Sequence, residues 1–361
     1  MGMIRDSYGR QTNYLRISIT DRCNFRCLYC MPPEGVPFLP REEILSYEEI
    51  MQVVKTAIGL GITRFKITGG EPLVRKGVVD FLKTLVQTPG VQWVSLTTNG
   101  LLLQKYASQL IASGINSINV SLNSLKADTF TRLSGGVDGL KDVRAGIDAL
   151  LNCGYKNIKI NTVVMNGYND DEILDLARLT IDHPIALRFI EYMPCGAAAE
   201  SRRLWRDGNW RSRSGVPIIS GQEESSGWTI STRELISQIG ALGRLSPTSL
   251  GQIGHGPARY YQLPGVPMPS DTGRSAREHR SAKGVIGFIT AVSQPFCATC
   301  NRLRLTADGQ LKSCLLSTDT IDLKPIISSS PQLVDAFIRA AMLKPGVHHN
   351  EELAVMSRIG G

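Results

Sequence analysis

The stretch DRCNFRCLYC, residues 21–30, carries three cysteines with the spacing C-x3-C-x2-C, namely Cys23, Cys27 and Cys30. A second group, in the stretch FCATCNRLRLTADGQLKSC, has the spacing C-x2-C-x13-C, namely Cys297, Cys300 and Cys314. Structural zinc sites close four protein ligands around the metal. Three thiolates in each group instead predict two 4Fe–4S clusters, each with one iron that no cysteine ligates and that can hold a small molecule.

The first triplet directly follows one of six strand-like runs that alternate with amphipathic helical stretches. This order predicts an α/β fold in which a parallel sheet, covered by helices, curls into a partial (β/α)6 barrel of the TIM type. Loops after the strands of such barrels build their sites. The expected strands are 14–19, 64–68, 93–97, 117–122, 157–164 and 186–191, and the expected helices are 47–58, 78–87, 102–113, 140–152 and 170–182.

The alternating pattern stops after Met193. We expect residues 5–242 to form the barrel core, with an irregular insert at about 196–226, and residues 243–361 to form a C-terminal region. That region would carry the second cluster, an irregular insert at about 265–283 and the tail Gly360-Gly361. Ser231 and Glu234 form a capping box that predicts a helix at 233–242. Ser330 and Pro331 fit the N-cap and N1 positions of a helix to about 342.

The composition of the chain indicates a folded protein without a membrane segment. Its 361 residues are 42% hydrophobic, and no apolar run is long enough to cross a bilayer or to act as a signal peptide. We therefore expect a cytoplasmic protein, whose clustered cysteines favour metal over disulfides because that compartment is reducing.

The net charge of +8 is explained either by an ordinary excess of surface cations or by a polyanionic ligand. No RNA-binding aromatic motif and no helix-turn-helix pattern is present. A nucleoside triphosphate is therefore favoured over a nucleic acid as the polyanion.

A second motif, ITGGEP, follows the strand at 64–68 and includes Gly70 and Glu71. Its glycines let the backbone approach a ligand, and the Glu71 carboxylate could accept a hydrogen bond from an ammonium group. Alone, the motif predicts only a tight strand-to-helix turn. Beside C-x3-C-x2-C with an aromatic residue before the last cysteine, it resembles the radical S-adenosylmethionine (SAM) enzymes. In that superfamily the motif binds the amino group of the methionine moiety.

The second triplet, with Arg302 and Arg304 just after Cys300, makes the resemblance more specific. Together with DRCNFRCLYCMP, ITGGEP, TTNG, NVSLN, RFIEYMP and the terminal Gly-Gly, it is similar to the GTP 3′,8-cyclase family over nearly the whole chain. The resemblance implies the first step of molybdenum cofactor biosynthesis. A 5′-deoxyadenosyl radical takes the C3′ hydrogen of GTP, and the C3′ radical then attacks C8 of guanine.

The resemblance also implies ligands, and it assigns no catalytic side chain. The six cysteines would bind two 4Fe–4S clusters, the second of which would face the guanine base. Taken singly, each remaining position could equally be a solvated charge or a packing residue. SAM would be lined by Tyr29, Gly70, Ser121 and Met193, and GTP by Arg16, Lys66, Thr97, Lys159, Arg302, Leu303 and Arg304.

Two positions depart from the family pattern. Lys66 stands where relatives commonly have arginine, so the charge is kept without the bidentate fork, and Arg64 is the candidate replacement. Asn123 stands where relatives often have aspartate, which removes one negative charge near the site. We expect both changes to affect substrate affinity rather than activity.

The resemblance implies partners as well: GTP as substrate, an electron donor such as flavodoxin or ferredoxin, and cyclic pyranopterin monophosphate synthase acting on the product. It implies neither nucleic acid nor membrane, and it leaves monomer and homodimer open. In the family the Gly-Gly tail inserts into the active site. Two rival functions are a radical SAM peptide maturase with an auxiliary cluster and, more remotely, a zinc-cluster nucleic-acid-binding protein.

Overall fold

The computed structural model describes residues 2–32, 35–193, 228–249, 256–263, 266–267, 279–280 and 282–347. Three of the expected features lie outside these residues, either wholly or for the most part: the insert at 196–226, the insert at 265–283 and the Gly360-Gly361 tail. Within the described residues, no helix is both long enough and apolar enough to cross a membrane.

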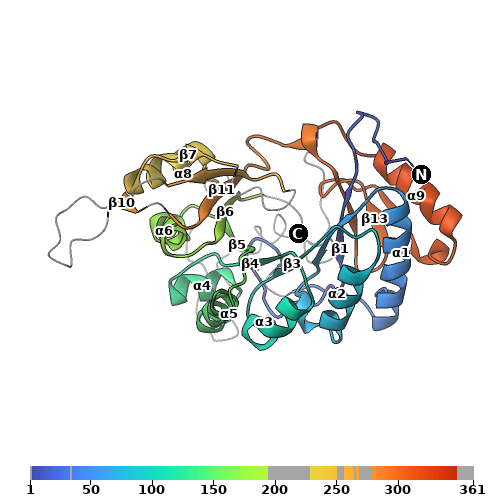
Figure 1. The fold of residues 1–361 in the computed structure, drawn as a ribbon, viewed down its shortest axis with the longest axis horizontal. Helices are drawn as coiled ribbons and strands as arrows, with labels where there is room; N and C mark the ends of the chain where they lie inside the picture. Colours follow the sequence, from blue (N-terminus) through green and yellow to red (C-terminus); the bar gives the residue numbers. More distant parts are fainter. Residues whose placement is uncertain are drawn as a thin grey trace.

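Six parallel strands form the centre of the sheet in the order of the sequence (Figure 1). Each begins within one residue of its predicted position, and the expected α/β barrel-like architecture is confirmed. Every pair of neighbours is parallel because a helical crossover separates the two strands. The strands are β1 (Tyr14–Ser18), β2 (Arg64–Thr68), β3 (Trp93–Thr98), β4 (Ser117–Ser121), β5 (Ile158–Val164) and β6 (Ala186–Glu191).

Helices cover the outer, convex side of this curved sheet (Figure 1). A capping box between Ser46 and Glu49 opens the first of them. The short helix α4 is the one crossover helix that the sequence analysis did not predict, since its seven residues carry too little periodicity. The helices are α1 (Tyr47–Gly59), α2 (Val78–Gln87), α3 (Leu103–Ala112), α4 (Ala127–Leu133), α5 (Leu140–Asn152) and α6 (Ile173–Asp182).

Strands from the C-terminal third extend the sheet at both edges. On one side β11 (Val285–Ile289) pairs parallel with β6, followed by β8 (Arg259–Gln262) and β7 (Ser246–Pro247). On the other side β12 (Arg302–Leu305) pairs parallel with β1, followed by β13 (Gln310–Lys312) and β14 (Thr320–Asp322). The C-terminal third therefore pairs with both outer strands of the central six, β1 and β6, so that neither is an edge strand of the sheet.

The remaining elements are short or lie at the periphery. The capping box of Ser231 and Glu234 is confirmed, and the helix that it opens, α8 (Thr232–Ile239), ends three residues earlier than predicted. The N-cap of α9 (Ser330–Met342) is Ser329, so the prediction for Ser330 was wrong by one residue. The others are β9 (Val266–Pro267), β10 (His279–Arg280) and the 3-10 turns η1 (Arg41–Glu43), η2 (Pro72–Val74), η3 (Asp170–Glu172), η5 (Gly240–Leu242), η6 (Cys297–Thr299) and η7 (Lys324–Ile326).

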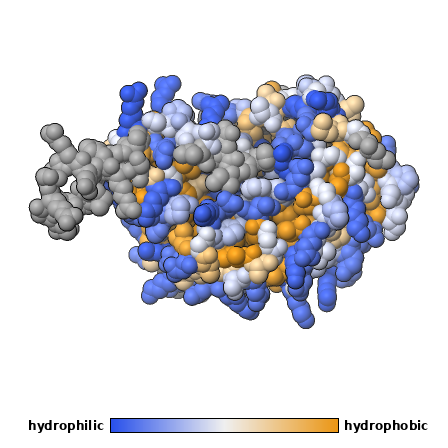
Figure 2. All heavy atoms as spheres, viewed as in Figure 1, coloured by the Kyte–Doolittle hydropathy of each residue, from blue (hydrophilic) through white to orange (hydrophobic). Residues whose placement is uncertain are grey.

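The hydrophobic core lies between the outer face of the sheet and the helices. Alternate residues of each strand face it, for example Leu15 and Ile17 of β1, which are fully buried. From the helices, α2 contributes Phe81, Leu82 and Leu85. On the face drawn in Figure 2, long hydrophilic side chains project at the rim and hydrophobic residues gather in a band inside them. Because side chains alternate along a strand, the residues between the core residues of each strand point into the barrel. These inward positions can therefore be polar, as Arg16 and Lys66 are.

Candidate active site

Two adjoining cavities occupy the interior of the barrel. The first has a volume of about 130 Å³ and is lined by Cys23, Cys27 and Cys30, and the second, of about 290 Å³, by Cys297, Cys300 and Cys314. We call them the N-terminal and the C-terminal cavity. Four residues line both of them: Tyr29, Thr97, Ser121 and Asn123. Molecules bound in the two cavities would therefore be neighbours.

The N-terminal cysteines lie on a tight loop between β1 and α1. The backbone N–H groups of Cys30 and Met31 both donate to the carbonyl of Cys27, at 2.9 and 3.1 Å. Burial raises the pKa of Cys23 to about 12 and that of Cys27 to about 11. Iron binds thiolate rather than thiol, so loading this site releases protons. Three thiols that share one cavity are a donor set of the kind that iron–sulfur clusters take.

The backbone of the ITGGEP motif passes so close to the backbone at Thr20 and Arg22 that Gly69 and Gly70 leave no room for a Cβ atom. A Cβ on Gly69 would lie 2.6 Å from the carbonyl oxygen of Thr20, and one on Gly70 would lie 2.3 Å from that of Arg22. The Gly70 N–H donates to Thr20 O at 2.7 Å, and the Glu71 N–H donates to Arg22 O at 2.8 Å. The motif is thereby joined to the start of the cysteine loop, and Gly70 reaches the wall of the N-terminal cavity.

The Glu71 side chain, in contrast, is absent from the walls of the described cavities. Its carboxylate is buried and accepts from Leu73 N at 2.9 Å, Thr98 Oγ1 at 2.8 Å and Asn99 N at 2.6 Å. Burial raises its pKa to about 7 despite these donors. The carboxylate thus ties the end of β2 to the end of β3, and its contact with a ligand ammonium stays a prediction.

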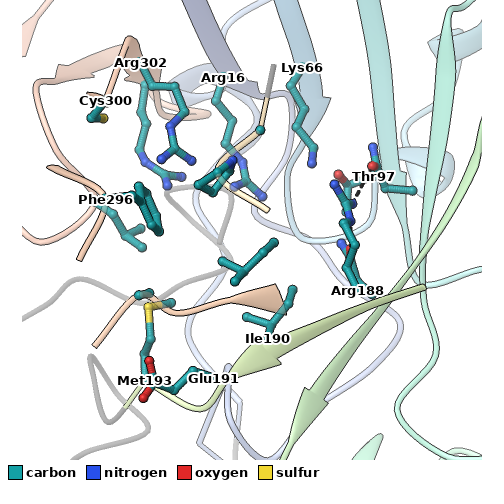
Figure 3. Close-up of a pocket in the computed structure, with 18 of the residues that line it drawn as sticks. Arg16, Lys66, Thr97, Arg188, Ile190, Glu191, Met193, Phe296, Cys300 and Arg302 are labelled. Carbon is teal, nitrogen blue, oxygen red and sulfur yellow. Dashed lines mark hydrogen bonds between the residues drawn. The ribbon is translucent and has the colours of Figure 1, made fainter. Parts of the chain in front are cut away.

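Positive side chains from neighbouring strands converge on the C-terminal cavity. Arg302, Arg16 and Lys66 project in the same direction from three adjacent strands, while Arg188 reaches the cavity from another side (Figure 3). Among the described lining residues Glu191 is the only carboxylate. The six cations of the lining are Arg16, Lys66, Lys159, Arg188, Arg302 and Arg304.

Burial and repulsion by neighbouring cations lower the pKa values of four of them: Arg16, Lys66, Lys159 and Arg304. Burial is the larger cause for Lys66, whose pKa falls well below its ordinary value, with Arg16 and Arg188 adding repulsion. Burial and Arg188 lower the pKa of Lys159 to about 7, and burial and Arg302 lower that of Arg304 to about 10. A bound polyanion would reverse the repulsion, so this cavity is built for concentrated negative charge.

Arg188 is the site residue that the sequence analysis missed. Its Nε donates to Asn161 Oδ1 at 2.8 Å and its Nη2 to Asn119 Oδ1 at 2.7 Å, which holds the guanidinium inside the barrel. A signal was available, because Arg188 alternates with apolar residues in the run ALRFIE of β6. An arginine inside a strand that is otherwise buried is costly unless it is paired or functional.

Leu303 and Arg64 do not lie where the sequence analysis expected them. Leu303 is fully buried in the hydrophobic core, pairs in register with Leu15 and is absent from the cavity lining. Arg64 also lies outside the lining, so it does not replace the fork that Lys66 lacks. Strand alternation explains Leu303, because Arg302 and Arg304 face inward and the residue between them must face outward.

The residues expected to line SAM fall around the junction of the cavities. Gly70 lines the N-terminal cavity, Tyr29 and Ser121 line both, and Met193 lines the C-terminal one. Asn123 Nδ2 donates to the Tyr29 hydroxyl at 2.9 Å, and burial raises the pKa of Tyr29 well above its ordinary value. Thr97 Oγ1 has no hydrogen-bond partner among the described residues. The hydroxyl is therefore available to a ligand in either cavity.

Glu191, the last residue of β6, binds the loop that precedes the second cysteine group. Its Oε2 accepts from Val292 N at 2.8 Å and Ser293 N at 2.9 Å, which fixes the loop between β11 and the cysteines. Burial acts to raise the pKa of Cys300, but Arg302 and Lys344 outweigh it and the pKa falls to about 7. Among the described residues, no three His, Cys, Asp or Glu side chains are grouped so as to hold a single metal ion.

Comparisons with known proteins agree with this site. Residues 17–180 match the radical SAM superfamily, and residues 216–350 match the family Molybdenum Cofactor Synthesis C. The chain is 41% identical to GTP 3′,8-cyclase of Geobacter sulfurreducens, over 99% of both chains. It is 40% identical to GTP 3′,8-cyclase of Heliobacterium modesticaldum, again over 99% of both chains.

A solved structure gives the same fold. Streptococcus suis SuiB bound to S-adenosylmethionine superposes with a TM-score of 0.53 at 15% identity, over 89% of this chain and 66% of that chain. Identity this low supports a shared fold alone, whereas identity near 40% over the full length establishes the family. The chain therefore belongs to the GTP 3′,8-cyclase family of the radical SAM superfamily.

Proposed function

We propose that this protein converts GTP to (8S)-3′,8-cyclo-7,8-dihydro-GTP, the first step of molybdenum cofactor biosynthesis. One observation carries the proposal: two cysteine triplets line adjoining cavities, and the second cavity gathers six cations. The family assignment supports the same activity, since the relatives of similar length are GTP 3′,8-cyclases.

In the N-terminal cavity Cys23, Cys27 and Cys30 would hold one 4Fe–4S cluster, beside SAM lined by Tyr29, Gly70, Ser121 and Met193. When bound, this pair supplies the 5′-deoxyadenosyl radical that abstracts the C3′ hydrogen of GTP. The protein's part is to place the ribose at the junction of the cavities. The Thr97 hydroxyl, which lines both cavities, is the polar group available there.

In the C-terminal cavity the cations would bind the triphosphate. Arginine forks pair bidentately with phosphate oxygens, and the lysines add compact charges. Arg188 is pre-oriented by Asn119 and Asn161, so less conformational entropy is lost when it binds phosphate. Cys297, Cys300 and Cys314 would hold the second 4Fe–4S cluster, whose open iron would face the base. Of the residues assigned to GTP from the sequence, Leu303 could contribute only through its backbone, because its side chain lies in the core.

The location of the charge also separates this proposal from its rivals. A nucleic-acid-binding protein would present its cations on the surface, and a peptide maturase would need an elongated groove. Here six cations line a cavity of about 290 Å³, a small anion's site.

The surroundings of the reaction follow from its chemistry. We infer that an electron donor such as flavodoxin or ferredoxin reduces the N-terminal cluster and that cyclic pyranopterin monophosphate synthase consumes the product. We place the protein in the cytoplasm, where thiolates stay reduced. We divide the chain into a barrel core, residues 5–242, and a C-terminal region, residues 243–361, although strands of the latter pair with the sheet of the former.

The test uses anaerobically reconstituted protein with SAM, dithionite and GTP that carries deuterium at C3′. Deuterium should appear in 5′-deoxyadenosine, in step with formation of the cyclised nucleotide. Omission of GTP is the control for uncoupled cleavage of SAM. Cleavage of SAM without transfer of deuterium and without cyclised product would contradict the proposal.

A further inference from the structure

Two buried cations contact the loop of the second cysteine group but do not line the described cavities. They are Arg10, from the N-terminal segment, and Lys344, which follows α9. Only 3% of Lys344 and 9% of the Arg10 side chain are exposed. Burying a charge is costly unless it is fully hydrogen-bonded, so the contacts of these two side chains need a reason.

Lys344 contacts the cysteine loop directly. Its Nζ donates to Cys300 O at 2.8 Å and to Arg302 O at 3.0 Å, and lies 3.9 Å from Cys300 Sγ. An ammonium has three donors, and here three acceptors surround it. Its own N–H donates to Ala341 O at 3.1 Å, which fixes the residue to the end of α9.

Arg10 holds the other end of the same loop. Its Nη1 donates to Cys297 O at 2.6 Å and its Nη2 to Pro345 O at 2.8 Å, and its Nε pairs with Asp6 Oδ2 at 2.6 Å. Asp6 is itself held by the N–H groups of Tyr8 and Arg10, at 3.0 and 2.9 Å. One guanidinium thus ties the N-terminal loop, the cysteine loop and the segment after α9 together.

We propose that Arg10 and Lys344 are positioning residues that fix Cys297 and Cys300 for the second cluster, and that Lys344 also sets the charge around it. The inference rests on the proposed function, since it concerns the cluster in the C-terminal cavity. Arg10 and Lys344 donate to the carbonyls of Cys297 and Cys300, and of these two cations Lys344 is the one that also reaches the Cys300 sulfur, beside Arg302. A fixed positive charge beside a cluster favours its reduced, more negative state.

The test compares the two clusters within one holoenzyme, so the N-terminal cluster is the internal reference. Lys344→Gln, Lys344→Arg, Arg10→Gln and wild type are reconstituted anaerobically. Iron release to a ferrous chelator and the midpoint potential of each cluster are then measured, the latter by electron paramagnetic resonance. Arg339→Gln is the matched control, because it also removes a cation from the α9 region, but one whose side chain is 66% exposed.

Lys344→Gln should release iron from the second cluster about 10-fold faster than wild type and shift its potential to more negative values. Lys344→Arg should recover most of the potential, since the charge is kept. Arg10→Gln should speed release with a smaller change of potential, because Arg10 contacts the cysteine loop at the Cys297 carbonyl and not at a sulfur. The first cluster, and both clusters in Arg339→Gln, should behave as in wild type.

Unchanged release and potential in Lys344→Gln would overturn the inference. So would an equal weakening of both clusters, because that result indicates a general folding defect rather than a local clamp. A wild-type protein with only the N-terminal cluster would instead overturn the proposed function.

Discussion

The two cysteine groups use the same ligand chemistry in opposite electrostatic surroundings. At the N-terminal group, burial raises the pKa of Cys23 to about 12 and that of Cys27 to about 11. At the C-terminal group, Arg302 and Lys344 overcome burial and bring the pKa of Cys300 to about 7. The first cavity has no lysine or arginine among its described lining residues, whereas the second has six.

This difference shows how one chain divides a reaction between two sites. The N-terminal cavity has no lysine or arginine in its described lining, so it suits a sulfonium cofactor, which a protein cation would repel. A cationic cavity suits a triphosphate, and it also stabilises the thiolates that ligate iron. The shared residues Tyr29, Thr97, Ser121 and Asn123 are the boundary across which a hydrogen atom would pass.

The largest expected effect comes from removing a cysteine from either group. Cys23→Ala should abolish cleavage of SAM and leave the second cluster, because the two triplets line separate cavities. Cys300→Ala should keep cleavage of SAM but lose cyclisation. Iron analysis and electron paramagnetic resonance measure the clusters, and product chromatography measures cleavage of SAM and cyclisation. If either variant lost both clusters while its circular dichroism stayed native, the two cavities would not be independent sites.

A smaller effect is expected for Arg304→Ala. Arg304 is buried and lies beside Arg16 in register, so its loss removes a charge-assisted contact to phosphate. Such contacts contribute on the order of 1.5–3 kcal/mol, which corresponds to a GTP dissociation constant raised about 10- to 100-fold. Calorimetry should show this change with SAM affinity unaltered.

Arg64→Ala is the matched control for that experiment. Arg64 lies on β2, which β1 separates from β12, and it is outside the cavity lining. Its loss should leave GTP affinity as it is. Equal effects of the two substitutions would mean that net charge, and not the cavity, binds GTP.

The pH dependence of GTP binding should depend on Lys159, whose pKa is about 7 without ligand. The triphosphate favours the protonated amine and raises this pKa, so binding takes up a proton above pH 7. Affinity should therefore be constant below pH 7 and fall by up to about tenfold per pH unit above it. Lys159→Met should remove the part of this dependence that is centred near pH 7. Lys156→Met, which removes an exposed lysine nearby, should retain it; a flat profile in wild type would exclude Lys159 as the titrating group.

The smallest effect is expected for Asn123→Asp, which restores the residue common in relatives. Asn123 accepts from Val163 N at 2.9 Å and donates to the Tyr29 hydroxyl, and an aspartate can accept from both. The fold should hold, and the added negative charge at the boundary should weaken GTP binding a few-fold, as measured by calorimetry. A gain in GTP affinity would show that negative charge at the boundary of the cavities does not repel GTP.

The sequence alone determined the elements of the barrel, because each depends on local rules. Period-two and period-3.6 patterns located six strands and five helices nearly to the residue, and the capping box located the start of α8. The cysteine spacings predicted the iron–sulfur clusters and the glycines of ITGGEP a tight turn, while SAM was implied by the resemblance that these motifs carry. The first two predictions were possible because ligand type and close backbone approach are properties of a few adjacent residues.

Only the tertiary structure decided how the C-terminal third completes the site. Pairing of β12 with β1 sets Arg304 beside Arg16, and pairing of β11 with β6 brings the second cysteine loop to Glu191. It also sends Leu303 into the core and buries Arg10 and Lys344 against the second cysteine loop. Contacts between residues almost 300 positions apart depend on strand order and register, and no local pattern in the chain encodes them.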